Sequence, residues 1–463
     1  MFHTPMSYVR AGMLGVAASL LLTGCDDMHD TTLANGMRVI VKEDHRSPVV
    51  VSMVWYKVGS IDEPKGLTGV SHVLEHMMFK GTKNHGPNEM SRIIAENGGR
   101  ENAFTSSDYT AYFQQLEKSR LPISFELEAD RMQGLTLDPE EFKKEVQVVM
   151  EERRLRTDDK PESLTYEKML SVAYQAHPYH HPVIGWMDDL QKLKIDDVRD
   201  WYRRYYRPNN ATLVVVGDVK PADVVELAKK YFGPIPARDF KRPPIPNEPP
   251  QSATRNTDVR APAQVPYLLM SYHVPVYSSV ETKKDDWEPY ALSVLGGVLD
   301  GGQSARFERE LVREKKVAVR AGAGYDAIGR APTLFIFDGT PAAGKSTKEL
   351  EQTIRAEIER IKREPISAEE LARVKAQVVA GDVFRRDSVF YQAMQLGQLA
   401  VSGLDLDLID ERVRRISAVT PQQVSAVARK YLVDSNLTVA VLDPLPISSN
   451  AKPPAAQRES NAH

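Results

Sequence analysis

Two stretches of the chain carry the same pattern of residues. Residues 194–217 read KIDDVRDWYRRYYRPNNATLVVVG, and residues 420–443 read TPQQVSAVARKYLVDSNLTVAVLD. Identical residues meet in a gapless alignment at Val198 and Val424, Arg203 and Arg429, Tyr205 and Tyr431, Asn210 and Asn436, Thr212 and Thr438, and Val215 and Val441. Each copy predicts an amphipathic helix, a turn and a β-branched strand. The chain therefore contains an internal repeat, and its two copies lie about half a chain apart.

The repeat divides the chain into two similar domains, which we place at residues 30–235 and 260–445. Alternating strands such as 37–42 and 266–274 occur among helical stretches in both parts, so we expect an α+β fold rather than a regular βαβ series. Seven prolines lie in residues 234–250, which predicts an extended, semi-rigid linker over residues 236–259. The polar end of the chain, residues 446–463, is predicted to be disordered.

Composition excludes several classes of protein. The 463 residues are 42% hydrophobic and 27% charged with a formal net charge of −3, which argues against a disordered protein and against a nucleic-acid-binding one. The chain has one cysteine, Cys25, so a disulfide framework is excluded.

Residues 1–24 have the features of a signal peptide. Arg10 precedes the apolar run 11–22, which is too short to span a bilayer stably. The run ends in Leu-Thr-Gly-Cys25, which resembles a bacterial lipobox and implies export and lipidation of Cys25. Asp26 favours retention at the inner membrane, facing the periplasm. No later stretch is apolar enough to span a membrane, so we expect attachment to the cell envelope through the lipid alone.

The candidate chemistry lies in residues 69–82, GVSHVLEHMMFKGT. On a helix, His72 and His76 are four residues apart and present both imidazoles on one face, where they can bind one ion. Glu75 lies beside them and can accept a proton from the attacking water. This H-x-x-E-H order is the inverse of the commoner zincin motif. It predicts one Zn²⁺ per chain.

A catalytic zinc usually has a third protein ligand. Residues 141–156, EFKKEVQVVMEERRLR, are strongly helical, and Glu145 and Glu152 lie two turns apart on one stripe. One of them could bind the metal while the other orients a histidine. Spacing alone does not separate Glu151 from Glu152.

Together, the H-x-x-E-H helix followed by Phe-Lys-Gly-Thr and the segment EVQVVMEER that begins at Glu145 resemble the pitrilysin/insulinase family. That family includes the mitochondrial processing peptidase and insulin-degrading enzyme. The resemblance implies that Glu152 is the third zinc ligand, that Glu145 supports a histidine ligand, and that Glu75 is the general base. It also implies two homologous α+β domains, each an antiparallel sheet covered by helices.

Two further segments match landmarks of the family. Residues 99–105, GRENAFT, match the edge strand to which a substrate adds, so Asn102 and Ala103 are predicted to bind substrate. Such binding selects an extended peptide more by its shape than by its sequence. Residues 177–182, HPYHHP, could suggest a second metal site, but their prolines favour an ordered loop.

The resemblance also predicts a partner. Active relatives enclose the peptide in four such domains, whereas this chain supplies two. In the family, an arginine and a tyrosine seven residues later assist substrate binding; here Arg313 is retained, but Arg320 stands at the tyrosine position. Tyr325 lies nearby but is predicted to face the other side of its strand. We therefore expect a heterodimer with a homologous subunit that keeps the pair; a homodimer is the alternative.

Two other functions compete with a zinc endopeptidase that cleaves extended peptides or unfolded segments. Residues 339–346, GTPAAGKS, fit the P-loop pattern, but a P-loop fold needs a parallel sheet, which this pattern does not supply. The second alternative is a non-catalytic scaffold or chaperone-like subunit of the same fold. Relatives of that kind typically lose the H-x-x-E-H residues, which this chain keeps.

Overall fold

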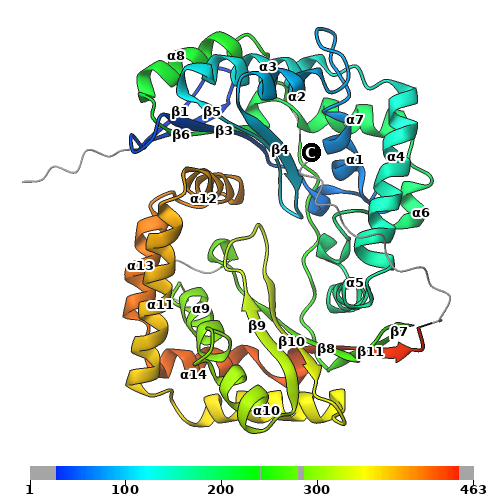
Figure 1. The fold of residues 1–463 in the computed structure, drawn as a ribbon, viewed down its shortest axis with the longest axis vertical. Helices are drawn as coiled ribbons and strands as arrows, with labels where there is room; N and C mark the ends of the chain where they lie inside the picture. The colour runs from blue at the N-terminus through cyan, green and yellow to red at the C-terminus, as the bar shows by residue number, and fades with distance from the viewer. Residues whose placement is uncertain (1–27, 240, 280–285, 448–463) are drawn as a thin grey trace, which may run out of the picture.

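A computed structural model describes residues 28–239, 241–279 and 286–447. The chain forms two halves, each built on one sheet with helices packed against it (Figure 1). The predicted signal peptide, Cys25, Asp26 and nearly all of the predicted tail lie outside the described residues. No helix in the described part is long and apolar enough to cross a membrane.

The first sheet has six strands in the order β1-β2-β6-β3-β5-β4. These strands are β1 (Met28–Thr32), β2 (Arg38–Glu43), β3 (Val49–Tyr56), β4 (Arg100–Thr105), β5 (Thr110–Glu117) and β6 (Ala211–Gly217). All neighbouring strands are antiparallel except β2 and β6, which are parallel. The helices of this half are α1 (Val70–Met77), α2 (Glu89–Glu96), α3 (Leu121–Gly134), α4 (Pro139–Arg153), α5 (Pro161–Ala173), α6 (Met187–Leu190), α7 (Ile195–Tyr205) and α8 (Pro221–Tyr231).

The second sheet repeats this plan with five strands in the order β7-β11-β8-β10-β9. They are β7 (Arg255–Pro262), β8 (Tyr267–Val274), β9 (Ala318–Tyr325), β10 (Thr333–Pro341) and β11 (Leu437–Leu445). Only β7 and β11 among them pair in parallel. Its helices are α9 (Glu288–Leu299), α10 (Thr347–Arg363), α11 (Ala368–Arg386), α12 (Val389–Ser402), α13 (Leu408–Ala418) and α14 (Pro421–Tyr431). The predicted α+β fold is thus confirmed, with one parallel pair in each otherwise antiparallel sheet.

The sequence repeat is a structural repeat. Its helix is α7 in the first copy and α14 in the second, and its strand is β6 or β11. The asparagine in the turn makes the same contact twice: Asn210 Nδ2 donates to Tyr205 O at 2.9 Å, and Asn436 Nδ2 donates to Tyr431 O at 2.9 Å. This asparagine is identical in both copies because it satisfies a carbonyl that the helix end leaves without a partner.

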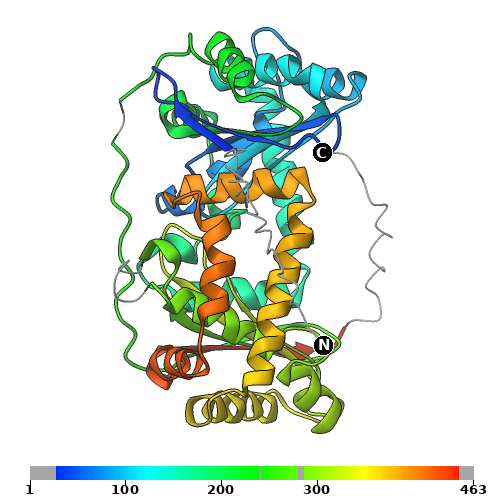
Figure 2. The same cartoon turned by 90° about the vertical axis from the view of Figure 1, so that its left-hand side faces the viewer.

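Each half places one of its helices against the sheet of the other half. Helix α5 of the first half packs against β7 and β11 of the second sheet, and α12 of the second half packs against β3 and β6 of the first (Figures 1 and 2). A shared apolar cluster joins Leu396 and Leu399 of α12 to Met53 and Trp55 of β3. Gly397 makes this approach possible, since a Cβ there would lie 2.0 Å from the Trp55 ring.

The predicted linker is extended along most of its length. Glu248 anchors it, because its carboxylate accepts hydrogen bonds from the backbone N–H groups of Gln175, Ala176 and His177 at 2.9–3.0 Å. The linker ends earlier than predicted: β7 begins at Arg255 and pairs with β11, so residues 255–259 belong to the second sheet.

Candidate metal and peptidase site

Helix α1 begins at a sharply constrained turn. Gly69 precedes it with φ at +86°, and a Cβ at Gly69 would lie 2.7 Å from Ile184 O. The two carboxylate oxygens of Glu63 accept hydrogen bonds from Gly69 N at 2.7 Å and Ser71 N at 2.9 Å. Glu63 therefore satisfies amides at the start of the helix, while burial raises the pKa of its carboxyl to about 7 against the opposing effect of these hydrogen bonds.

His72, His76 and Glu152 converge between α1 and α4. Their candidate ligand atoms all lie within 4.8 Å of one another. Glu152 Oε2 is 3.6 Å from His72 Nε2 and 3.5 Å from His76 Nε2. That oxygen is buried and has no hydrogen-bond partner in the described part of the protein. A buried carboxylate oxygen between two imidazole nitrogens fits a bound metal ion, and two histidines with one carboxylate form a known catalytic zinc ligand set.

The neighbouring glutamate lies elsewhere. The Glu151 side chain is 64% exposed and pairs with Arg154 on the helix surface, whereas the Glu152 side chain is 17% exposed. The structure thus separates the two residues that spacing alone leaves open.

Glu145 contacts the site from behind His76. Its Oε2 lies 3.1 Å from His76 Nδ1, and its Oε1 lies 2.9 Å from Lys80 Nζ. This leaves Nε2 of His76 directed at Glu152. A carboxylate behind a ligating histidine fixes the ring orientation and the tautomer. Glu145 therefore has the geometry of a supporting residue rather than of a ligand.

Charge is distributed unevenly over the two histidines. Burial, together with the neighbouring His76, lowers the pKa of His72 to about 4. Burial also opposes the charged form of His76, but the neighbouring carboxylates of Glu145 and Glu152 outweigh it and raise the pKa of His76 to about 9. Without a metal ion, His72 is therefore neutral while His76 keeps a proton near neutral pH, and a bound metal ion would displace that proton, because both ligating rings must be neutral.

Glu75 lies on the same helix and is not one of the three converging residues. Its carboxylate accepts a hydrogen bond from the Thr105 hydroxyl at the end of β4. Burial raises the pKa of Glu75, while the Thr105 contact opposes that rise. A raised pKa suits a carboxylate that must take up and release a proton near neutral pH.

Strand β4 forms the open edge of the first sheet. It carries Asn102 and Ala103, and Asn102 Oδ1 accepts a hydrogen bond from Ala103 N at 2.8 Å. Since Thr105 on the same strand contacts Glu75, an added peptide strand would run beside the general-base candidate.

Arg313 and its neighbours lie in the second half. Arg313 lies in η7 (Phe307–Glu314) and is half exposed, and its guanidinium donates a hydrogen bond to Gln303 O. Arg320 is 60% exposed and pairs with Asp338 at 3.0 Å on β10. The Tyr325 ring stacks on Phe335, and its hydroxyl donates to Pro275 O. Tyr325 is therefore committed to the core of its own half.

The other motifs have structural roles. Ser346 of the P-loop-like segment caps α10 through Glu349 N at 3.1 Å, and Lys345 pairs with Glu349 at 3.2 Å. The preceding β10 runs antiparallel to both neighbours, so the parallel-sheet setting of a P-loop is absent there. In the HPYHHP loop, His177 Nδ1 accepts from Tyr179 N at 3.2 Å. Among the described residues, the only group arranged to hold a metal is His72, His76 and Glu152.

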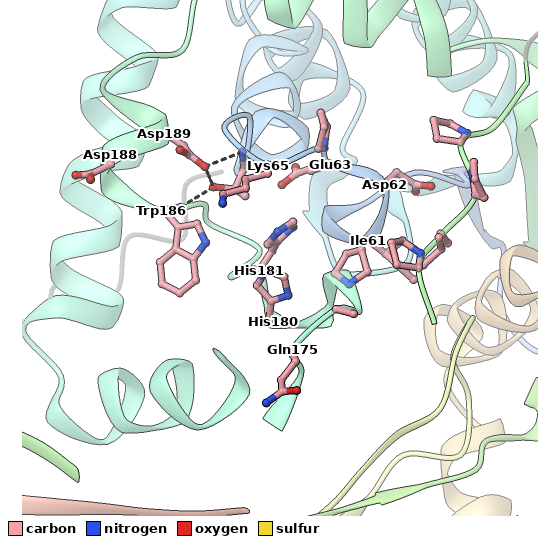
Figure 3. A pocket seen from close by; sticks show the side chains of 18 of the residues that line it. Ile61, Asp62, Glu63, Lys65, Gln175, His180, His181, Trp186, Asp188 and Asp189 are labelled. Carbon is pink, nitrogen blue, oxygen red and sulfur yellow. Dashed lines mark hydrogen bonds between the residues drawn. The ribbon is translucent and has the colours of Figure 1, made fainter. Parts of the chain in front are cut away.

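A separate cavity of about 930 Å³ lies behind the turn that leads into α1 (Figure 3). Asp62, Glu63 and Lys65 border one side of it, and His181 and Trp186 border another. None of the described residues that line it belongs to the converging group of His72, His76 and Glu152.

Sequence reasoning missed four supporting contacts. Lys80 pairs with Glu145, Arg156 Nη1 pairs with Glu152 Oε1 at 2.7 Å, Thr105 contacts Glu75, and Glu63 caps α1. Lys80 follows His76 by four residues, so a position near the same carboxylate could be expected from the sequence, although α1 itself ends at Met77. Glu63 and Thr105 carry no local signal, because the loop and the strand meet α1 only in the folded chain.

The comparisons with known proteins agree with this geometry. Residues 38–185 match the family model described as "Insulinase (Peptidase family M16)", and residues 192–378 match the "Peptidase M16 inactive domain". The chain is 33% identical over 446 residues to zinc protease PqqE of Helicobacter pylori, which covers 93% of this chain and 98% of that protein.

Solved structures show the same likeness. A protease from Helicobacter pylori matches with a TM-score of 0.85 and 33% identity, covering 90% of this chain and 99% of that one. The periplasmic protease PqqL from Escherichia coli matches with a TM-score of 0.76 and 20% identity, covering 91% of this chain but 48% of its own. The fold and the site thus define a two-domain α+β protein in which two histidines and a glutamate are placed as candidate metal ligands. The chain belongs to the insulinase family, peptidase family M16, which confirms the resemblance drawn from its motifs.

Proposed function

We propose that this chain is a zinc-dependent endopeptidase that cleaves extended peptides or unfolded protein segments. The observation that carries the proposal is the buried Glu152 Oε2, which lies 3.5–3.6 Å from Nε2 of both His72 and His76 without a hydrogen-bond partner in the described chain. Those three residues would hold one Zn²⁺ per chain. When bound, zinc supplies a Lewis acid that polarises the peptide carbonyl and favours ionisation of water.

The chain's own residues perform the other tasks. Glu75 accepts a proton from the attacking water and then donates it to the leaving amine. Thr105 orients the Glu75 carboxylate. The edge strand β4 holds the peptide by main-chain hydrogen bonds, with Asn102 and Ala103 beside it, so recognition depends on an extended backbone.

Replacement of Glu75 by glutamine tests the mechanism. The amide keeps the shape of the side chain but cannot take up the proton, so hydrolysis of an unfolded protein should fall by about 10²–10⁴-fold. Zinc content should remain that of the wild type, because Glu75 is not among the converging donor atoms. Hydrolysis at the wild-type rate by Glu75→Gln would refute the assigned role.

A non-catalytic scaffold of the same fold is the second candidate function. The match of residues 192–378 to a model described as an inactive domain favours it. The retained residues of the first half count against it, since a scaffold needs neither a buried Glu75 nor the convergence on Glu152. Hydrolysis that zinc removal abolishes would exclude the scaffold.

The proposal places the enzyme in the bacterial cell envelope. Cys25 would carry a lipid after removal of residues 1–24, and Asp26 favours the inner membrane with the enzyme facing the periplasm. The lipid would be the only attachment to the membrane.

A homologous partner completes the proposal. Arg320 stands where the family has a tyrosine, and its guanidinium pairs with Asp338, so this chain does not supply the Arg–Tyr pair. We therefore include in the proposal a heterodimer. Its partner subunit would provide both the arginine and the tyrosine, of which this chain keeps only the arginine, Arg313. The coverage of only 48% of the PqqL chain is in line with a family unit twice this size. Full peptidase activity of a homodimer purified alone would exclude the heterodimer.

A further inference from the structure

One arginine of the second half is buried in the first. Arg330 lies in the loop between β9 and β10, and its side chain is 6% exposed. Its Nη1 lies 2.8 Å from Asp62 Oδ2, and its Nη2 lies 3.1 Å from Asp62 Oδ1. This is a bidentate ion pair between the halves, the geometry in which an arginine holds a carboxylate most firmly.

The same arginine also holds a second segment of the first half. Its backbone N donates to Asp108 Oδ2 at 3.1 Å, and its Nη1 donates to Asp108 O at 3.1 Å. Tyr179 donates its hydroxyl to the Asp108 carboxylate at 2.8 Å. Asp108 is therefore fixed by both its side chain and its carbonyl.

Asp62 and Asp108 lie on the two segments that lead into the proposed active site. Asp62 directly precedes Glu63, which caps the zinc helix α1; the two lie together on the turn that borders the cavity in Figure 3. Asp108 lies in the turn that joins β4 to β5, three residues after Thr105, the residue that contacts Glu75.

The two turns also contact each other through their main chains. Ile61 N donates to Ser107 O at 2.9 Å, and Ser60 N donates to Ser106 O at 3.3 Å. A Cβ at Gly59 would lie 2.4 Å from Ser106 O, so only glycine allows this approach. Arg330 therefore binds a compact unit that connects the start of α1 with the end of β4.

We propose that Arg330 is a positioning residue through which the second half sets the start of the zinc helix and the end of the substrate-binding strand. The inference rests on the proposed function, and it assigns an active-site task to the half that contains most of the residues matched by the inactive-domain model. Arg330 acts through Asp62 and Asp108 and is not among the residues proposed to hold the metal or the substrate.

The competing explanation is that Arg330 only ties the halves together. Two apolar contacts already do so, through α5 on the second sheet and α12 on the first. Asp62 also pairs with Arg242 of the linker, and this ion pair should remain when Arg330 is changed. Loss of the Arg330 side chain should therefore leave a folded protein whose turns are less firmly held.

The test compares Arg330→Gln, Arg330→Lys and wild type in the full chain, without substrate. One readout is the zinc dissociation constant, measured by competition with a chromophoric chelator. The other is hydrogen exchange at the amides of Gly69 and Ser71, which Glu63 protects. Arg330→Gln should weaken zinc binding by about tenfold, at the low end of outer-shell effects, and speed exchange at both amides. For Arg330→Lys, the zinc dissociation constant and the exchange rates should lie between those of wild type and Arg330→Gln, because lysine keeps the positive charge but cannot form the bidentate contact.

Arg260→Gln is the matched control. Arg260 also pairs with an aspartate in the second half, Asp443 at 3.3 Å, but both side chains are exposed. Arg260→Gln should change neither the zinc dissociation constant nor the exchange at Gly69 and Ser71. A lowered melting temperature in Arg330→Gln with zinc affinity within about twofold of wild type and unchanged exchange would overturn the proposal.

Should Arg330→Gln be insoluble, Asp62→Asn carries the same readouts, and unchanged exchange at Gly69 and Ser71 would again overturn the proposal. These readouts need no hydrolysis. A wild-type protein that binds zinc but cleaves nothing would therefore contradict the proposed function and leave the role of Arg330 open to this same test.

Discussion

The two halves place corresponding helices in the same setting with opposite chemistry. Helix α1 packs against α7 in the first half, as α9 packs against α14 in the second. Helix α1 buries His72 and Glu75 at 8% and 9% exposure, whereas the interior of α9 is apolar, with Tyr290, Leu292 and Leu295 in the core. The fold therefore needs only an apolar helix at this position.

This difference separates what the fold requires from what the chemistry requires. Burying a polar or charged group without full compensation costs free energy. The first half carries that cost at α1 and offsets part of it through Glu145, Thr105 and Glu63. The second half avoids this cost along the interior of α9, and the buried carboxylate at the start of that helix, Glu288, is paired with Lys430 and Tyr431. The proposed function therefore explains the polar residues within α1, and changes to them should affect chemistry more than folding.

The strongest test of this separation uses two adjacent glutamates of α4. Glu152→Gln replaces the carboxylate that faces both histidines with a neutral amide, a much weaker metal ligand, so zinc affinity should fall by more than the roughly 10–100-fold cost of losing an outer-shell partner. Glu151→Gln alters an exposed side chain and should leave zinc affinity unchanged. Competition with a chelator measures both. Equal zinc affinity in the two variants would remove Glu152 from the site.

A change to the packing of α12 on the first sheet should have a smaller effect, and it should lower the stability of the protein rather than its zinc affinity. In Gly397→Ala the new Cβ would lie 2.0 Å from the Trp55 ring, and such overpacking typically lowers the free energy of unfolding by about 1–3 kcal/mol. Gly381→Ala in α11 meets only the tip of Arg385 at 4.0 Å and should stabilise the helix by up to about 1 kcal/mol. Denaturant unfolding measures both changes. A neutral Gly397→Ala would show that α12 does not lie tightly on the first sheet.

The repeated asparagine should show the smallest effect and the closest agreement between the halves. Asn210→Ala and Asn436→Ala each remove the hydrogen bond to the last tyrosine of the preceding helix. Each should lower the free energy of unfolding by about 1 kcal/mol and leave zinc affinity unchanged. A large loss of zinc affinity in Asn436→Ala alone would mean that the repeat has a functional rather than a structural basis.

Much of this arrangement could be predicted from the sequence, and the exceptions have physical causes. The repeat of α7 and β6 in α14 and β11 is visible because helix and strand periodicities are local. His72, Glu75 and His76 are visible because four residues make about one helical turn. The exchange of α5 and α12 is not visible, because an amphipathic helix reveals which of its faces is buried but not which sheet buries it.

The separation of Glu151 from Glu152 also needed the fold. Both lie on the same helix, and only the approach of α1 to α4 decides which one faces the histidines. Arg330 is a similar case, since 268 residues separate it from Asp62 in the chain. Long-range pairs of this kind leave no local pattern.

Zinc removal and restoration tests the central claim most directly. The wild-type protein, together with any partner needed for activity, should hydrolyse an unfolded protein, lose that activity when a chelator strips its zinc, and regain it when one zinc ion per chain is returned. Glu75→Gln, carried through the same steps, should bind the returned zinc and stay inactive. Hydrolysis that persists in the stripped protein, or that is equal in wild type and Glu75→Gln, would contradict the assignment of a zinc peptidase to the first half.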